Sequence, residues 1–233
     1  MYMLVMTQPV DHPNLNKRIT SACTYACRFC QKENILDYSL RDLYTDERVK
    51  EPIESPGHVI LTGGDPLLHP DLQAIIQELT DYGHRVSIVT NGSQLDRQNL
   101  LQLKGKVDWI WVPLDSCLDE KETFLGRGSG NHVSHIIHIA AKIHELGIHL
   151  GLWTVVCQET YQENLLPLIR IVEPERWKVV PEPGLSTDKF LHFINRHSQI
   201  VLDSGRSPDF SFWQNSECLC GNTPKYLWKL EAR

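Results

Sequence analysis

Alternation of strand-type and helix-type segments is the feature of this 233-residue sequence that most limits its fold. Apolar residues recur at the helical period in 70–83, 93–105, 132–147 and 161–172. Between these segments, runs rich in β-branched and aromatic residues predict six strands: "KRIT" (17–20), "HVILT" (58–62), "RVSIVT" (85–90), "VDWIWVPL" (107–114), "HLGLWTVV" (149–156) and "RWKVV" (176–180). A chain of this kind folds as a parallel sheet with helices packed outside it.

The number of strand–helix units determines whether that sheet closes into a barrel. Several strands are apolar on successive residues, which is typical of a parallel sheet covered on its outer side. Six units of about 30 residues each are too few to close an eightfold barrel. We therefore predict an α/β fold, an open partial (β/α)6 barrel over residues 1–198, with a short C-terminal extension over 199–233 that packs on the barrel.

Charge and hydropathy exclude two classes of partner. The net charge is -6, and no run of five like charges occurs, so we expect no binding to a nucleic-acid polymer. No stretch of about 18 apolar residues runs uninterrupted, so we predict no spanning helix. The N-terminus lacks a basic region followed by a long apolar segment, so it is interpreted as a lead-in strand and not as a signal peptide. A cytoplasmic protein without membrane association is expected.

Three cysteines gather in one short loop after the first predicted strand. The segment "CTYACRFCQ" (23–31) contains Cys23, Cys27 and Cys30. Without a signal peptide, clustered thiols indicate metal ligands more than disulfides. A structural zinc site requires four protein ligands. Three thiolates on a 4Fe-4S cluster leave one iron open, and the amino and carboxylate groups of S-adenosylmethionine (SAM) have the form that would complete its coordination.

Glycines and short polar side chains follow the other predicted strands. "TGGDP" follows the second strand, "TNGS" the third, and "LDS" and then "GRGSG" the fourth. The carboxyl ends of parallel strands meet at one edge of a barrel, where loops carry the chemistry. We therefore expect one barrel mouth to gather all of these segments with the three cysteines.

The CxxxCxxC spacing after the first strand, together with "GGDP" after the second, resembles the radical SAM superfamily. In that superfamily a reduced 4Fe-4S cluster cleaves SAM to a 5'-deoxyadenosyl radical, which removes a hydrogen atom from the substrate. The resemblance implies a barrel of the radical SAM type and both cofactors. It assigns the cluster to three metal ligands: Cys23, Cys27 and Cys30.

The resemblance and the chemistry of the strand ends predict a set of residues that bind SAM. Gly63, Gly64 and Asp65 correspond to the strip that holds the SAM amino group, because glycines allow the backbone to approach a ligand closely. Arg127 lies between glycines that we expect to leave its guanidinium accessible to a carboxylate. The other predicted cofactor-binding residues are short polar side chains suited to ribose hydroxyls, an adenine contact and the aromatic residue beside the third cysteine: Thr90, Asn91, Ser93, Asp115, Ser116, Val155 and Phe29.

A narrower resemblance covers residues 14–198. "VSIVTNGS", "LDSCLDEKETFLGRGSG", "PERWKVV" and "FLHFINRH" are similar to viperin and its prokaryotic relatives. This implies dehydration of a ribonucleoside triphosphate to its 3'-deoxy-3',4'-didehydro form, an antiviral chain terminator, with an electron donor such as flavodoxin or ferredoxin. Asn16 matches that branch, and Arg176 and Lys178 match its phosphate-binding pair. These two cations alternate along their strand and should share one face, with Trp177 on the buried face.

The fifth strand departs from that branch and leaves alternatives open. The lysine and asparagine of the branch fall on Gly151 and Trp153, which removes one cation. The base is therefore unknown, and a different radical SAM reaction, on a deazapurine-type or peptide substrate, is an alternative. A non-catalytic iron-sulfur or nucleotide-binding protein is another. In the tail, Lys225 or Tyr226 either enters the site or belongs to a packed surface segment.

Two further groups of metal-ligand residues are interpreted as structural. Histidines at positions 132, 135 and 138 recur every three residues on a predicted helix. They rotate around it without an i, i+4 pair that would face one metal, so a solvated helix face is predicted. Cys218 and Cys220 offer only two thiols without flanking partners, so a second cluster is not predicted.

Overall fold

A computed structural model of the protein describes residues 14–30, 37–39, 41–42, 56–200, 205 and 209–210. The predicted lead-in strand and most of the predicted 199–233 extension, with Cys218, Cys220, Lys225 and Tyr226, lie outside the described residues. The six predicted strands are all present: β1 (Asn14–Thr20), β2 (His58–Gly63), β3 (Arg85–Val89), β4 (Trp109–Pro113), β5 (His149–Val156) and β6 (Arg176–Pro181).

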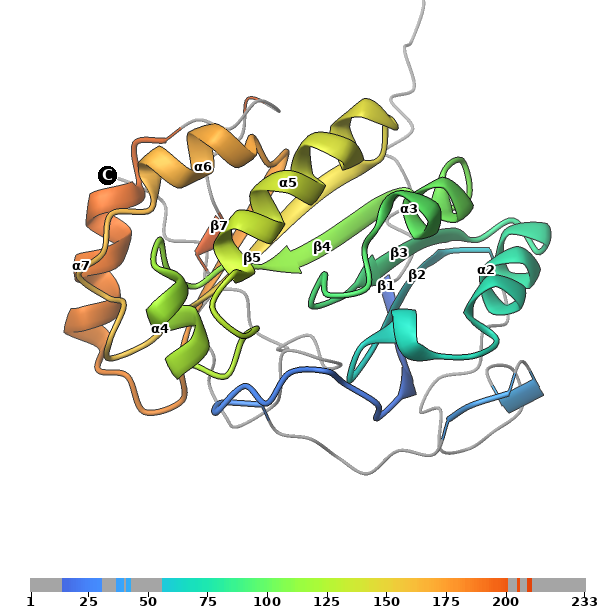
Figure 1. The fold of residues 1–233 in the computed structure, drawn as a ribbon, viewed down its shortest axis with the longest axis horizontal. Helices are drawn as coiled ribbons and strands as arrows, with labels where there is room; N and C mark the ends of the chain where they lie inside the picture. The colour runs from blue at the N-terminus through green and yellow to red at the C-terminus, as the bar shows by residue number, and fades with distance from the viewer. Residues whose placement is uncertain are drawn as a thin grey trace, which may run out of the picture.

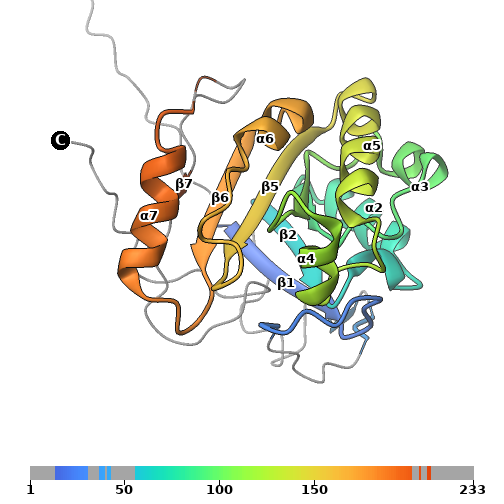
Figure 2. The same cartoon turned by 60° about the vertical axis from the view of Figure 1, so that its left-hand side comes forward.

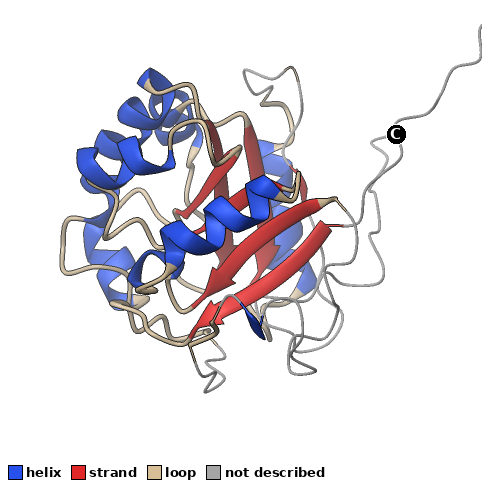
Figure 3. Ribbon diagram, turned by 90° about the vertical axis from the view of Figure 1, so that its right-hand side faces the viewer, coloured by secondary structure: helices blue, strands red, loops and turns tan. Residues whose placement is uncertain are grey.

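The strands form one parallel sheet in sequence order (Figure 1). A short seventh strand, β7 (Asp209–Phe210), pairs in parallel with β6 and was not predicted. In the described part of the chain, β1 and β7 are the two ends of the strand order and do not pair with each other, so the barrel is open. The red strands in Figure 3 form this curved sheet, with most of the helices on one side. The predicted open α/β barrel is confirmed.

Helices connect the strands, and their bounds follow the local sequence. A 3-10 turn, η1, spans Pro66–Leu68, and the helices are α2 (Leu72–Asp81), α3 (Arg97–Leu103), α4 (Asp119–Phe124), α5 (His132–Glu145), α6 (Leu166–Val172) and α7 (Thr187–His197). Helix α6 begins five residues later than the predicted 161, because Pro167 lacks an N–H and is favoured only in the first turn. Helices α4 and α7 were not predicted.

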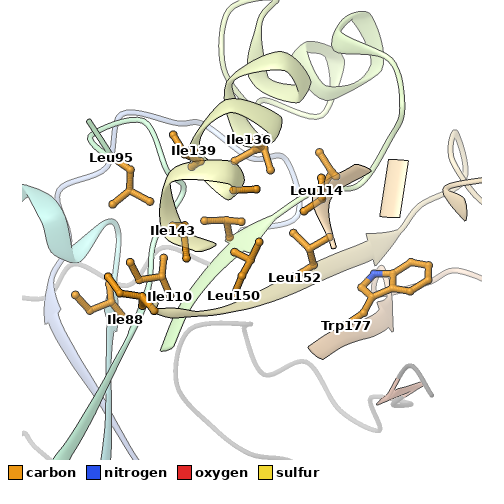
Figure 4. Packing of buried hydrophobic residues seen from close by; sticks show 14 of the residues in the cluster. Ile88, Leu95, Ile110, Leu114, Ile136, Ile139, Ile143, Leu150, Leu152 and Trp177 are labelled. Atoms are coloured by element: carbon orange, nitrogen blue, oxygen red, sulfur yellow. The ribbon is translucent and has the colours of Figure 1, made fainter. Parts of the chain in front are cut away.

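The outer face of the sheet is the main hydrophobic core. Ile110 of β4 and Leu152 of β5 are fully buried there against Ile136 and Ile143 of α5. Figure 4 shows these side chains pointing toward one another, and Figure 2 shows α2, α3 and α5 on the same side of the sheet. The amphipathic period of α5 explains this contact, since its apolar stripe faces the strands.

The inner face of the sheet has a different composition. Because side chains alternate along a strand, the neighbours of the buried residues point inward, and parallel register sets them side by side. In β5, Gly151 and Trp153 lie opposite Arg176 and Lys178 of β6. The predicted alternation of β6 is confirmed, since Trp177 is 1% exposed on the outer side.

Among the described residues, no helix has both the length and the apolar character needed to cross a lipid bilayer.

Candidate functional site

The cysteine loop follows β1 and is held by the loop after α4. The backbone N–H of Ala26 donates to the Gly126 carbonyl at 3.1 Å, and that of Arg28 donates to the Leu125 carbonyl at 3.1 Å. A Cβ at Gly126 would overlap the Ala26 carbonyl. The glycine therefore permits the two loops to lie backbone against backbone.

Two glycines where β2 ends, Gly63 and Gly64, hold the same loop from the other side. The N–H of Gly64 donates to the Thr20 carbonyl and that of Asp65 to the Ala22 carbonyl, both at 2.7 Å. A Cβ at Gly63 or Gly64 would overlap the carbonyl oxygens of Thr20 and Ala22, respectively. The close approach that these glycines allow is to the cysteine loop itself. Their contact with the SAM amino group stays a prediction.

The three thiols fit the donor set of an iron-sulfur cluster. None of the three forms a disulfide within the described residues, and all three are partly buried. Burial raises the pKa of the Cys27 thiol to about 11, and the Cys30 and Cys23 charges add to this, while Arg127 opposes it. The Cys23 sulfur accepts hydrogen bonds from the Tyr25 N–H at 3.4 Å and the Asn91 side-chain amide at 3.5 Å. Such bonds to sulfur support a cluster ligand.

The number of cysteines bears on the kind of metal centre. Among the described residues, no group of three or more His, Cys, Asp or Glu side chains is placed to hold a single metal ion. A structural zinc site takes four protein ligands, whereas a cubane held by three thiolates keeps one iron open. This donor set therefore suits a cluster better than a mononuclear zinc site.

Hydrogen bonds join the ends of β1, β2 and β3. The Thr90 hydroxyl donates to the Asp65 Oδ1 at 2.7 Å, and the Asn91 amide donates to the Thr24 hydroxyl at 3.0 Å. The Thr24 and Ser93 hydroxyls lie 2.7 Å apart. The predicted gathering of these strand ends is confirmed.

Asp65 keeps one oxygen without a protein partner. Its Oδ1 accepts from Thr90 and from the Leu67 N–H, whereas its buried Oδ2 has no hydrogen-bond partner among the described residues. Burial raises the pKa of Asp65, and the hydrogen bonds that it accepts oppose this shift. A buried acceptor without a donor fits the predicted contact with a cofactor amino group.

Arg127 corrects one expectation. Its guanidinium is not accessible: the residue is 5% exposed, and its Nε donates to the Asp115 Oδ2 at 2.5 Å. Glu122 lies 3.8 Å from the same nitrogen. Asp115 and Glu122 are both buried, and a buried carboxylate is stabilised by pairing with a cation. This pairing explains why Arg127 is inaccessible although glycines flank it. Binding of the SAM carboxylate by Arg127 stays a prediction.

Asp115 and Ser116 are engaged in the same network. Asp115 is fully buried, and its Oδ1 accepts the Val155 N–H at 2.7 Å, so it ties the end of β4 to β5. The Ser116 hydroxyl donates to Glu163 at 2.8 Å. Glu122 accepts the N–H groups of Asp115 and Ser116 at 2.7 and 2.8 Å. Sequence reasoning missed Glu122 and Glu163, because their partners are set by the fold.

An apolar cluster lies beside this network. Val155 packs with Leu125 and Val180, and Phe29 packs against them. The Arg127 guanidinium carbon lies 5.2 Å from the centre of the Phe29 ring. The structure therefore brings together two predicted cofactor-binding residues, Phe29 and Val155, that lie far apart in the sequence.

The predicted phosphate-binding residues lie farther along the inner face. The Arg176 guanidinium carbon is 4.7 Å from the centre of the Trp109 ring, and the Lys178 ammonium is 4.4 Å from that of Trp153. Asn16 is partly buried in β1, where its register partner is Ile60 of β2. Their roles toward a substrate stay predictions.

The expectation of a solvated histidine face is wrong for His132. This residue is 1% exposed, and its Nδ1 lies 3.1 Å from the Tyr25 hydroxyl inside the cysteine loop. Its Nε2 lies 3.0 Å from the Pro113 carbonyl oxygen. Burial, and then the Arg127 charge, lower the pKa of His132 to about 3, so it is neutral and structural. His135 is also not fully solvated, with its Nε2 2.8 Å from the Gly92 carbonyl oxygen.

Comparison with known proteins agrees with this geometry. Residues 18–166 match the radical SAM superfamily. The S-adenosylmethionine-dependent nucleotide dehydratase of a Thermoplasmatales archaeon (strain ISO4-H5) is 30% identical over 199 residues, which are 79% of this chain and 72% of that protein. The dehydratase of the same name from Flammeovirga pacifica is 29% identical over 211 residues, covering 80% of this chain and 73% of its own.

Among solved structures, Streptococcus suis SuiB bound to its precursor peptide SuiA has a TM-score of 0.66 at 15% identity. The match covers 88% of this chain and 49% of SuiB, so this chain spans about half of that protein. At this identity the likeness establishes the fold. The sequence matches, which include the cysteine loop, establish the family. The chain belongs to the radical SAM superfamily, in its viperin-like group of S-adenosylmethionine-dependent nucleotide dehydratases.

Proposed function

We propose that this protein dehydrates a ribonucleoside triphosphate to its 3'-deoxy-3',4'-didehydro form. The observation that carries the proposal is the inner face of β6, where Arg176 and Lys178 lie on the side of the sheet that continues to Val180 and the cysteine loop. The similarity to nucleotide dehydratases over 79% of the chain supports it. Two cations below a cluster site match a triphosphate whose sugar lies nearer the mouth.

The cofactors supply the radical chemistry, and the chain holds and orients them. When bound, the 4Fe-4S cluster and SAM would supply a 5'-deoxyadenosyl radical that takes the 4'-hydrogen atom of the substrate sugar; loss of the 3'-hydroxyl as water would then consume one proton and one further electron from the reductant. We assign the cluster to Cys23, Cys27 and Cys30. Asp65 would accept from the SAM amino group through its unpartnered oxygen.

The remaining predicted cofactor residues divide into two kinds. Phe29 and Val155 offer an apolar surface for adenine and exclude water from the radical. Asp115 and Ser116 are bonded within the protein, so we assign them to positioning, by way of Arg127 and β5. A guanidinium carries five donors, so for the SAM carboxylate we keep Arg127 as a candidate partner through an N–H other than Nε, which requires the ligand to reach this buried side chain.

The test is a nucleotide series with a reconstituted cluster. Anaerobic protein receives dithionite and SAM, and 5'-deoxyadenosine is measured with CTP, GTP, UTP or ATP. Release stimulated by one nucleotide, with a product lighter by one water, is expected. Release unmoved by all four nucleotides would favour a different radical SAM reaction, and no cleavage at all would favour a non-catalytic binding protein.

The proposal also includes a cellular compartment and an electron donor. We assign it to the cytoplasm, because the described helices include none that could span a membrane and thiol-bound clusters require a reducing compartment. The exposed face of the cysteine loop, at Arg28, would receive electrons from a donor such as flavodoxin or ferredoxin.

A further inference from the structure

Three tryptophans form a continuous surface on the inner face of the sheet. Trp109 and Trp111 of β4 stack with ring centres 5.8 Å apart and an interplanar angle of 25°. Trp111 meets Trp153 of β5 edge to face at 6.5 Å and 74°. All three are partly buried and none belongs to the main core cluster. We call Trp109, Trp111 and Trp153 the aromatic wall.

Gly151 makes the aromatic wall possible. Trp111 and Gly151 are register partners in the parallel ladder. A Cβ at Gly151 would overlap the Trp111 ring, because the indole lies directly over this glycine. At position 151 this chain therefore differs from the viperin-like pattern in two ways. It lacks the lysine, and the absence of a side chain leaves room for the Trp111 ring.

The two cations of β6 rest on this wall. Arg176 lies over Trp109 and Lys178 over Trp153, at 4.7 and 4.4 Å from the ring centres. Lys178 is also the register partner of Trp153. Indole faces attract cations, so the wall holds the Lys178 ammonium over Trp153.

Trp153 stands between this surface and the cofactor side of the barrel. It packs against the cluster that contains Val155, two residues farther along the same strand face, which is about 7 Å. Its indole Nε1 is buried and has no hydrogen-bond partner in the part of the chain that the structure describes. A buried donor without a protein acceptor fits a site where a ligand supplies one.

We propose that the aromatic wall is the nucleobase-binding surface of this protein. The base stacks on Trp153, and the Lys178 ammonium moves from the indole face to the triphosphate. The inference rests on the proposed function, since it assumes a nucleotide substrate. Stacking on indole is strong and tolerant of base identity. The exchange is favourable because an ammonium–phosphate hydrogen bond is stronger than a cation–π contact.

The experiment separates the base from the phosphates. Binding of ATP, GTP, CTP, UTP and inorganic triphosphate to the full-length protein, with its cluster reconstituted anaerobically, is measured by calorimetry. The base advantage is the affinity of the best nucleotide divided by that of inorganic triphosphate. Trp153→Leu removes the ring, and Trp153→Phe is the matched control that keeps an aromatic face. Cluster absorbance and far-ultraviolet circular dichroism establish that each variant is folded.

Trp153→Leu is expected to reduce the base advantage by about 5- to 150-fold, while Trp153→Phe keeps most of it and inorganic triphosphate binds all three proteins alike. Gly151→Ala is expected to lower the base advantage too, because it displaces Trp111. An unchanged base advantage in both Trp153→Leu and Gly151→Ala would overturn the inference. So would a wild-type protein that binds inorganic triphosphate as tightly as every nucleotide.

Nucleotide dehydration is measured separately in the same protein preparation, and it tests the proposed function. Loss of one water from a nucleotide by the wild-type enzyme supports it, whatever the Trp153 variants do. A dehydrating enzyme whose base advantage survives in both variants would thus retain the proposed function and lose this inference. A protein that shows the Trp153-dependent advantage but forms no dehydrated product would do the reverse.

Discussion

The two faces of the sheet are built from the same strands and differ in almost every other respect. The outer face presents aliphatic side chains such as Ile110 and Leu152, fully buried under helices. The inner face presents Trp153, Arg176 and Lys178, none of them fully buried. The outer face supplies stability by removing apolar area from water. The inner face keeps polar and aromatic groups available, so the two faces should respond differently to substitution.

The largest effect is expected at the mouth of the inner side. Cys27→Ala removes one of three cluster ligands and should abolish both the visible absorbance of the reconstituted cluster and SAM cleavage. The metal-free variant should unfold at nearly the wild-type denaturant concentration, because Cys27 is only partly buried. Cys117→Ala, a partly buried thiol outside the loop, is the matched control. Retained absorbance in Cys27→Ala would refute the cluster assignment.

The outer face should show the opposite pattern. Leu152→Ala leaves a void under the helices and should lower the free energy of unfolding by about 2 to 5 kcal/mol, measured by urea denaturation. Affinity for nucleotides should not change in the fraction that remains folded. Leu152→Met, which keeps the volume, should cost less than about 1.5 kcal/mol. A loss of nucleotide affinity with unchanged stability would break the distinction between the faces.

Lys178→Ala, on the inner face, should affect nucleotide binding and leave stability nearly unchanged. Loss of a charge-assisted contact to phosphate should weaken nucleotide binding by about 1 to 3 kcal/mol, measured by calorimetry, with little change in stability. Lys189, which lies over Tyr161 at 5.4 Å outside the inner face, is the matched lysine. Lys189→Ala should bind nucleotides normally. Equal affinities of the two variants would remove the phosphate assignment.

The smallest effect concerns the buried acid at the mouth. Burial, and then the Asp115 charge, raise the pKa of Glu122 to about 8, while Arg127 opposes this. The folded protein thus favours the protonated carboxyl. Its stabilising contribution is present below the ordinary value of 4.5 and is lost as the pH rises toward 8.

Glu122→Gln cannot ionise and keeps an oxygen that can accept the Asp115 and Ser116 N–H groups. In metal-free protein, the fall in unfolding free energy between pH 4.5 and 8 should shrink by at least about 1 kcal/mol. Urea denaturation at several pH values measures it. Identical pH profiles for the two proteins would show that Glu122 is ionised in the fold.

Local pattern was sufficient for the architecture, and it also predicts where the cluster binds. Six strands and four helices can be predicted from the sequence pattern, because the spacing of apolar residues shows which face of a strand or which side of a helix is buried. The cysteine spacing predicts a cluster site for a related reason, since three ligands within nine residues need no distant partner. Helix α4 escaped detection because its "DEKETF" sequence is polar, with Glu122 as its buried residue.

Tertiary structure alone decided the partners of the buried charges and the use of the inner face. Arg127 is inaccessible because Asp115 lies beside it, and His132 is buried because Tyr25, 107 positions away in sequence, reaches its ring. Gly151 indicated a missing cation in the sequence, yet in the fold it makes room for Trp111. These contacts span from 12 to 107 positions of sequence, and no local periodicity records them, because they form only once the folded sheet has brought its strand ends and loops together.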